Sequence, residues 1–243
     1  MPQVEVSFSP DLYPFYENEE AIVVVIDIFR ATSAMCAAFQ NGVKEMIPVR
    51  RIEDALDYKK KGYVVAAERK GEVVEGFQLG NSPFHYMNDW VKDKTIVITT
   101  TNGTRAISMA KRAHEVVVGS FLNASVLADW LCEQNRDVVL LCAGWRGRFN
   151  MEDSLFAGCM VEKLAESGNF DEFSDSAHVA RQMFEMGKSD MNKYLIDSSH
   201  RRRLNGLNLE EDIKYCLQMD VAPVLPVLQN GRLIDLLKEE LLP

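Results

Sequence analysis

Short runs of β-branched and apolar residues recur along the first part of the chain, and the segments between them carry apolar residues at helical spacing. Continuous apolar runs of about four residues are typical of strands buried on both faces of a sheet. Alternation of such strands with helices predicts an α/β fold, a largely parallel or mixed sheet with helices on both faces. The predicted strands are residues 23–26, 64–67, 95–98, 116–118 and 138–141, and the predicted helices are residues 31–39, 52–60, 105–113 and 125–133.

The pattern changes beyond residue 168. Residues 171–220 are predicted to form mainly short helices and loops, and residues 223–228 one further strand. No linker rich in Pro, Gly or Ser separates the two parts. We therefore expect one domain over residues 1–243, divided into a motif-bearing sheet with its helices (1–168) and a mainly helical C-terminal part (169–243).

Composition narrows the function classes. The chain has 27 basic and 36 acidic residues, a formal net charge of −9, which argues against broad nucleic-acid binding. The longest apolar run, residues 21–26, is far shorter than the ~20 residues that cross a bilayer. No basic region precedes an apolar one at the N-terminus, and the five cysteines are widely spaced. We expect a cytoplasmic protein with reduced thiols and no membrane or nucleic-acid partner.

Polar side chains follow the predicted strands where each strand ends, and ligands of open parallel sheets bind at those carboxyl ends. After the first strand come Asp27, Arg30, Thr32 and Ser33. The carboxylate suits a metal ion, and the hydroxyls with helix amides suit an anion. The alternative is that Asp27 ends the strand and a hydroxyl caps the helix. Glu68, after the second strand, would complete a metal site beside Asp27.

The strongest local signal follows the third strand, where four hydroxyls, an amide, a glycine and an arginine lie within residues 99–105. Short hydroxyl side chains and a glycine that lets backbone amides approach closely form a cradle for an oxyanion at the start of a helix. The spacing is neither that of a nucleotide P-loop nor that of a dinucleotide fold. A small phosphorylated or sulfonated ligand is therefore favoured, bound by Thr100, Thr101, Asn102, Gly103, Thr104 and Arg105.

The segment after the predicted strand 138–141 permits two chemistries. Glu152 and Asp153 open a long helix, either as a first-turn acidic pair that suits the helix dipole or as metal ligands. Cys142 and Arg148 have the Cys-x₅-Arg spacing of cysteine phosphatases, although a buried thiol explains Cys142 as well. Carboxylates alone repel a phosphate, whereas Mg²⁺ between them bridges protein and substrate oxygens.

Six motifs in order along most of the chain resemble those of the 2-phosphosulfolactate phosphatase family of coenzyme M biosynthesis. They are Asp27-x-x-Arg30-Ala31-Thr32-Ser33, Glu68-Arg69, Gly76-Phe77-x-Leu79-Gly80-Asn81-Ser82-Pro83, Thr99-Thr100-Thr101-Asn102-Gly103-Thr104-Arg105-Ala106, Cys142-Ala143-Gly144 and Glu152-Asp153. Gln78 departs from the family's pattern, which tends to have Asp there.

The resemblance implies a Mg²⁺-dependent phosphatase with an α/β fold of its own that hydrolyses 2-phospho-3-sulfolactate to 3-sulfolactate and phosphate. Transferred to the matching motifs, it indicates catalytic roles for Asp27, Arg30, Glu68, Cys142 and Asp153, and a metal held by Asp27, Glu68, Glu152 and Asp153. The expected substrate-binding residues are Arg30, Thr32, Ser33, Asn81, Thr100, Thr101, Asn102, Gly103, Thr104, Arg105 and Gly144.

Other functions remain open at this point. A non-catalytic module that binds a phosphorylated metabolite needs the cradle and the arginines but not the acidic cluster, and a cysteine phosphatase using Cys142 and Arg148 needs no metal. The expected ligand is a small phosphorylated and sulfonated organic acid, and a homodimer is a possible assembly. Residues 198–203 are expected to fold over the sheet edge and to hold the second anionic group, the alternative being a plain surface helix.

Overall fold

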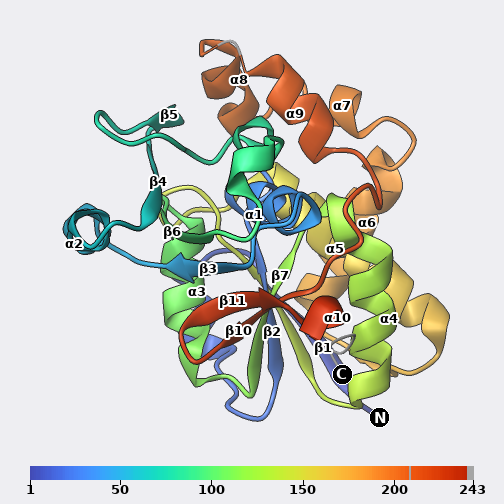
Figure 1. Ribbon diagram of the computed structural model, residues 1–243. Helices are drawn as coiled ribbons and strands as arrows, with labels where there is room; N and C mark the ends of the chain where they lie inside the picture. Colours follow the sequence, from blue (N-terminus) through green and yellow to red (C-terminus); the bar gives the residue numbers. More distant parts are fainter. Residues whose placement is uncertain (208, 240–243) are drawn as a thin grey trace.

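The computed structural model describes residues 1–207 and 209–239. Within them one mixed sheet has the strand order β5-β4-β6-β3-β11-β10-β7-β2-β8-β1-β9, and helices cover both of its faces (Figure 1). The predicted fold class is therefore confirmed. The strands are β1 (Gln3–Ser7), β2 (Ile22–Ile26), β3 (Glu45–Pro48), β4 (Val64–Arg69), β5 (Glu72–Val73), β6 (Thr95–Thr99), β7 (Glu115–Gly119), β8 (Val138–Cys142), β9 (Glu172–Phe173), β10 (Pro226–Gln229) and β11 (Arg232–Asp235).

The helices follow the strands in the predicted alternation up to residue 167, and short helices make up most of the C-terminal part. Their bounds are α1 (Ala31–Gln40), α2 (Ile52–Lys60), α3 (Gly103–Met109), α4 (Ala124–Gln134), α5 (Met151–Ser167), α6 (Asp175–Gly187), α7 (Met191–Tyr194), α8 (Ser199–Asn205), α9 (Glu210–Cys216) and α10 (Leu236–Glu239). The described residues also form five 3₁₀ turns: η1 (Tyr13–Phe15), η2 (Pro83–Tyr86), η3 (Asp89–Val91), η4 (Ala110–Arg112) and η5 (Phe121–Asn123).

All five strands predicted from apolar runs are present as β2, β4, β6, β7 and β8. Five strands were not predicted. β1 and β3 were missed because Glu5, Glu45 and Pro48 interrupt their apolar pattern, and β5, β9 and β11 are short strands of two to four residues. The strand predicted over residues 223–228 begins later, at Pro226, and is the first arm of the antiparallel β10–β11 hairpin. This hairpin joins two parallel blocks of strands, pairing with β7 on one side and β3 on the other.

The core explains why the central strands are apolar throughout. Along β2, Ile22, Val24 and Ile26 belong to the cluster that packs with α4, α5 and α6, whereas Val23 and Val25 belong to the cluster on the opposite face with α1 and α3. Successive side chains of a strand point to opposite faces, so a sheet covered on both sides needs apolar residues at every position.

The parallel pairing of β2 with β7 and β8 brings their carboxyl ends to one edge of the sheet. Figure 1 shows α8 and α9 at the top of the view, above α1 and beside the β4–β5 hairpin. Contacts between residues far apart in sequence hold them there, such as the ion pair of Arg30 with Asp212 of α9. The C-terminal part thus packs on the motif-bearing part.

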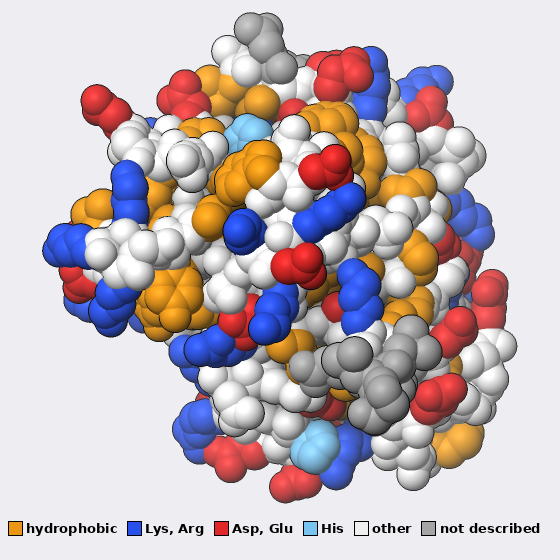
Figure 2. Space-filling view, in the orientation of Figure 1, with side chains coloured by type: hydrophobic (Ala, Val, Ile, Leu, Met, Phe, Trp, Pro, Cys, Tyr) orange, Lys and Arg blue, Asp and Glu red, His pale blue; other side chains and the backbone are white. Residues whose placement is uncertain are grey.

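The surface has mixed charge. On the face drawn in Figure 2, basic and acidic side chains are interspersed rather than gathered by sign. No helix of the described residues is long and apolar enough to cross a membrane.

Close packing of α5 on α6 gives a test of the fold. A Cβ added at Gly158 of α5 would lie 2.0 Å from the carbonyl oxygen of Ala180 in α6, so Gly158→Ala forces the two helices apart. We expect a loss of about 1–3 kcal/mol in the free energy of unfolding, measured with urea. Gly206→Ala is the control, because the nearest atom to its Cβ lies at 3.4 Å. Equal stability of the Gly158 variant and the control would contradict this packing.

Candidate active site

Loops from the carboxyl ends of β2, β4, β6 and β8 meet under α8 around one narrow cavity. Its volume is about 10 Å³, which is room for about one water molecule. The walls combine carboxylates, amides, cations and aromatic rings: Asp27, Phe29, Arg30, Glu68, Gly71, Asn81, Asn102, Trp145, His200, Arg203 and Leu204. The structure therefore brings together predicted site residues from three of the strand ends.

Asp153 connects two of these loops from the first turn of α5. Its Oδ1 accepts the backbone N–H of Ile28 at 2.8 Å, and its Oδ2 accepts the N–H of Gly144 at 2.9 Å and the side-chain amide of Asn150 at 2.8 Å. The buried carboxylate thus fixes the loop after β2 against the loop after β8. Gly144, a predicted substrate contact, takes part through its backbone.

Glu68 holds the loop after β6 to the turn after β4. Its Oε1 accepts the N–H of Gly71 at 2.6 Å, and its Oε2 accepts the N–H of Thr101 at 3.1 Å. The Thr101 hydroxyl also bonds this carboxylate, at 3.3 Å. Glu68 therefore faces the cavity with both oxygens already engaged by backbone amides.

Asp27 and Glu152 retain free acceptor capacity. Asp27 has one long contact, 3.4 Å from Oδ1 to the N–H of Ala31, and Glu152 bonds Nδ1 of His200 at 2.5 Å through Oε1 while Oε2 is buried without a partner in the described residues. Burial, opposed by His200 and reinforced by Glu68, raises the pKa of Asp27 from its ordinary 3.8 to about 6. Burial and the charge of Asp27 raise the pKa of Asp153 as well. The site thus gathers more negative charge than its apolar surroundings favour.

The hydroxyl-rich segments mainly build the loops. Thr32 Oγ1 accepts the N–H of Asp27, Ser33 donates to the carbonyl of Ile28, and Thr100 and Thr104 bond each other's backbone. Of residues 99–105, Asn102 alone lines the cavity, and neither Thr32 nor Ser33 does. A Cβ at Gly103 would lie 2.9 Å from Asp27 Oδ2, so only glycine lets α3 begin against this carboxylate.

The two predicted anion-binding arginines are placed differently. Arg30 lines the cavity, but its terminal nitrogens bond Asp212 at 2.5 Å and the carbonyl of Gly71 at 2.6 Å. Arg105 pairs with the exposed Asp11 at 2.6 Å and is not among the cavity-lining residues. Asn81 lines the cavity and has a buried Oδ1 without a partner among the described residues.

Cys142 and Arg148 do not form a phosphate-binding loop in this structure. The Cys142 thiol is fully buried at the end of β8, and burial together with the charge of Asp153 raises its pKa well above the usual range. The Arg148 side chain is exposed, and neither residue lines the cavity. A nucleophilic cysteine needs a lowered pKa, so this environment opposes that role.

The C-terminal segment contributes His200 and Arg203 to the cavity wall. Arg201 is instead buried, bonding Asn192 and Glu210. Trp145 stacks under the Arg203 guanidinium, with 3.3 Å from its central carbon to the ring centroid. Trp145 was not among the predicted site residues, although its place beside Gly144 in a strand-end loop was a signal for it.

The residues of this site fit Mg²⁺ only if water and substrate supply some of the ion's ligands. Within residues 1–207 and 209–239, no three His, Cys, Asp or Glu side chains lie close enough together to form a metal site by themselves. Mg²⁺ in phosphoryl-transfer sites is commonly held by one or two carboxylates, with water and substrate phosphate as the other ligands. Asp27 lines the cavity, whereas Glu152 does not; Glu152 contributes to the raised pKa of Asp27 and keeps a buried Oε2 without a partner among the described residues.

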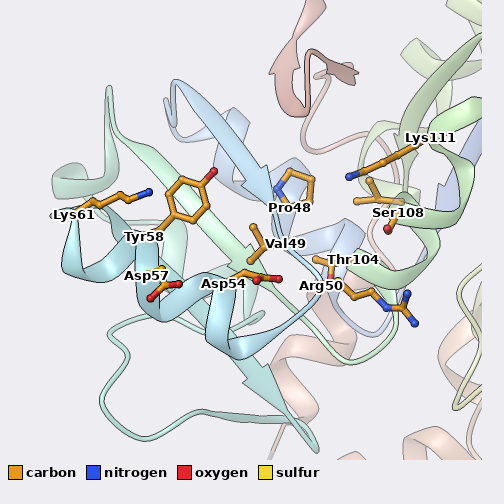
Figure 3. A pocket seen from close by; sticks show the side chains of 11 residues that line it. Pro48, Val49, Arg50, Asp54, Asp57, Tyr58, Lys61, Thr104, Ser108 and Lys111 are labelled. Carbon is orange, nitrogen blue, oxygen red and sulfur yellow. The ribbon is translucent and has the colours of Figure 1, made fainter.

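Larger hollows lie elsewhere. A cavity of about 300 Å³ adjoins the site and shares Arg30, Gly71 and Asn81 with it. Another, of about 430 Å³, lies between α2 and α3, with Tyr58 on one wall and Ser108 on the other (Figure 3). It contains none of the four candidate metal-binding carboxylates.

Comparison with known proteins points to one family. The family model described as 2-phosphosulpholactate phosphatase matches residues 7–231. Proteins named probable 2-phosphosulfolactate phosphatase from Caldanaerobacter subterraneus and Thermotoga maritima are 42% and 41% identical to this chain, covering 88% and 89% of it and 90% and 92% of their own lengths. One from Clostridium botulinum is 33% identical over 96% of this chain and all of its own length.

The raised pKa of Asp27 predicts how stability changes with pH in the absence of divalent cations. Between about pH 4 and pH 6 the folded protein keeps a proton on Asp27 that the unfolded chain has lost. The free energy of unfolding therefore falls as pH rises through this range. Asp27→Asn is therefore expected to raise the free energy of unfolding at pH 8, by up to about 3 kcal/mol, and much less at pH 4. Urea unfolding with chelator at both values tests this; a variant less stable than wild type at pH 8 would contradict it.

Proposed function

This chain belongs to the 2-phosphosulpholactate phosphatase family, and from that premise we propose that it is a Mg²⁺-dependent phosphomonoesterase acting on 2-phospho-3-sulfolactate or a related small anionic organic phosphate. The products are the alcohol and phosphate, and the expected location is the cytoplasm. The observation that supports this most is the meeting of Asp27 and Glu68 with Arg203 and Asn102 around one cavity at the carboxyl edge of the sheet.

We propose Asp27 and Glu152 as the carboxylates that hold Mg²⁺, with Glu68 beside them. When bound, the ion supplies Lewis-acid polarisation of phosphoryl oxygens and offsets the charge of the site. Asp153, whose oxygens accept three N–H groups, acts by holding the loops that present Asp27 and Gly144. This divides the four predicted ligands into two that bind and two that mainly position.

The remaining residues bind and orient the substrate. Asn81 and Asn102 offer amides to its polar groups, and Arg30 presents positive charge from the wall shared with the neighbouring cavity. A trianionic substrate needs such cations because one divalent ion does not balance its charge together with that of the carboxylates. Substrate entry requires the narrow cavity to widen, and the adjoining cavity is the route that the shared walls favour.

Metal dependence is the first test. Phosphate release from 2-phospho-3-sulfolactate, beside a plain monophosphate such as phosphoglycolate, is measured with Mg²⁺ and with excess chelator. We expect chelation or Asp27→Asn to lower kcat/KM by about a thousandfold or more, because several kcal/mol of charge stabilisation is lost. Asp89→Asn, at an exposed carboxylate on η3, is the control and should leave turnover unchanged. Full turnover in chelator would contradict the metal mechanism.

Cys142→Ser separates this function from a cysteine phosphatase. Because the thiol is buried and its pKa is raised, we expect the variant to keep kcat/KM within about tenfold of wild type, a change of no more than ~1.4 kcal/mol. Circular dichroism checks that the variant folds. A folded variant without activity would restore Cys142 as the nucleophile.

A further inference from the structure

Arg203 has unused hydrogen-bond donors inside the candidate site. Its side chain is partly buried on α8, and its guanidinium lies over the Trp145 indole. Nε and one terminal nitrogen, Nη2, are buried and have no hydrogen-bond partner within the described residues. Buried N–H groups without partners cost free energy, more so on a cation, so this arrangement indicates an acceptor that is bound only in the working state.

The other two arginines of the same run are placed differently. Arg201 has a buried Nε without a partner in the described residues, but both of its terminal nitrogens are used within the protein, on Asn192 and on Glu210. Arg202 is exposed. Arg203 alone of the three lines the cavity. Arg201 therefore has a structural role, Arg202 lies on the surface, and Arg203 faces the site.

We propose that Arg203 donates its free N–H groups to the phosphoryl oxygens of the substrate. This rests on the proposed function for the identity of the substrate, but the chemistry requires only a phosphate dianion. A guanidinium presents several N–H groups in a rigid plane that matches two oxygens of a phosphate.

The position of Arg203 favours the phosphoryl group over the second anionic group. Arg203 and Asp27 line the same narrow cavity, so a group that reaches the carboxylates also reaches the guanidinium. Burial lowers the pKa of Arg203, while Glu152 and then Glu68 oppose that shift, so both carboxylates act on it. A phosphoryl group in this cavity would meet the Arg203 guanidinium beside the carboxylates that would hold Mg²⁺, and cations near the phosphoryl oxygens are what phosphoryl transfer requires.

Trp145 is the positioning residue of this contact. A guanidinium stacked on an indole face is attracted by the ring while the N–H groups at its edge stay available to an acceptor. The loop that presents Trp145 is held by Asp153 through the neighbouring Gly144. The phosphate-binding arginine and the carboxylates are thus supported by one hydrogen-bonded unit.

Binding of inorganic phosphate, measured by titration calorimetry with Mg²⁺ present, tests the proposal without reference to the substrate. Arg203→Gln is expected to raise the Kd for phosphate about ten- to a hundredfold, with a smaller loss for Arg203→Lys. Arg202→Gln, the exposed neighbour on the same helix, is the control and should bind phosphate as wild type does. Unchanged phosphate binding by folded Arg203→Gln, or no phosphate binding by wild type, would overturn the proposal.

A parallel titration with 3-sulfolactate identifies which group Arg203 contacts. If Arg203→Gln weakens 3-sulfolactate binding and leaves phosphate binding intact, the residue serves the second anionic group and the proposal is wrong. If wild type does not hydrolyse 2-phospho-3-sulfolactate but Arg203→Gln still loses phosphate affinity, the substrate assignment fails and the role of Arg203 stands. The two failures are therefore distinguishable.

Variants of Trp145 test positioning. Trp145→Phe keeps an aromatic face and should retain most of the phosphate affinity, whereas Trp145→Leu should lose affinity about as Arg203→Gln does. The double variant should lose little more than either single one, because both changes remove one contact. Additive losses, or equal effects of Phe and Leu, would contradict positioning through the ring.

Discussion

The burial of four carboxylates at one edge of the sheet is the constraint on which the rest of the site depends. Asp27, Glu68, Glu152 and Asp153 are all buried, and burial of a charge without a partner is strongly unfavourable. Their charges are offset in three ways: Asp153 and Glu68 accept backbone N–H groups, Glu152 bonds His200, and the pKa of Asp27 is raised. A divalent cation would offset the charge that remains.

This requirement also explains why the C-terminal part belongs to the site. The strand-end loops supply most of the negative charge, whereas His200 and Arg203 come from α8. Asp212 of α9 in turn takes up Arg30, which keeps that guanidinium at the wall of the cavity. The sheet alone would therefore leave the acidic cluster open to water and short of cations. With α8 packed over the edge, the cavity has room for about one water molecule.

The sequence predicts an element correctly where only one structure explains its residue pattern. Strands buried on both faces must be apolar throughout, so β2 and β8 were predictable, whereas β3 ends in Pro48 and was not. Because parallel strands end at one edge of the sheet, the sequence correctly predicted that Asp27 and Glu68 lie at one site. It could not show that most of the hydroxyls bond their own loops, nor that Trp145 would lie under Arg203, because such contacts depend on how loops from distant segments pack.

Proton release on metal binding tests the central claim most directly. If Mg²⁺ binds the buried carboxylates, it must displace protons near pH 6, where Asp27 is still partly protonated. Titration calorimetry in buffers of different ionisation enthalpy should give a heat of Mg²⁺ binding that depends on the buffer at pH 6. The dependence should be reduced in Asp27→Asn. Absence of Mg²⁺ binding, or a heat independent of buffer and unchanged in the variant, would contradict the account.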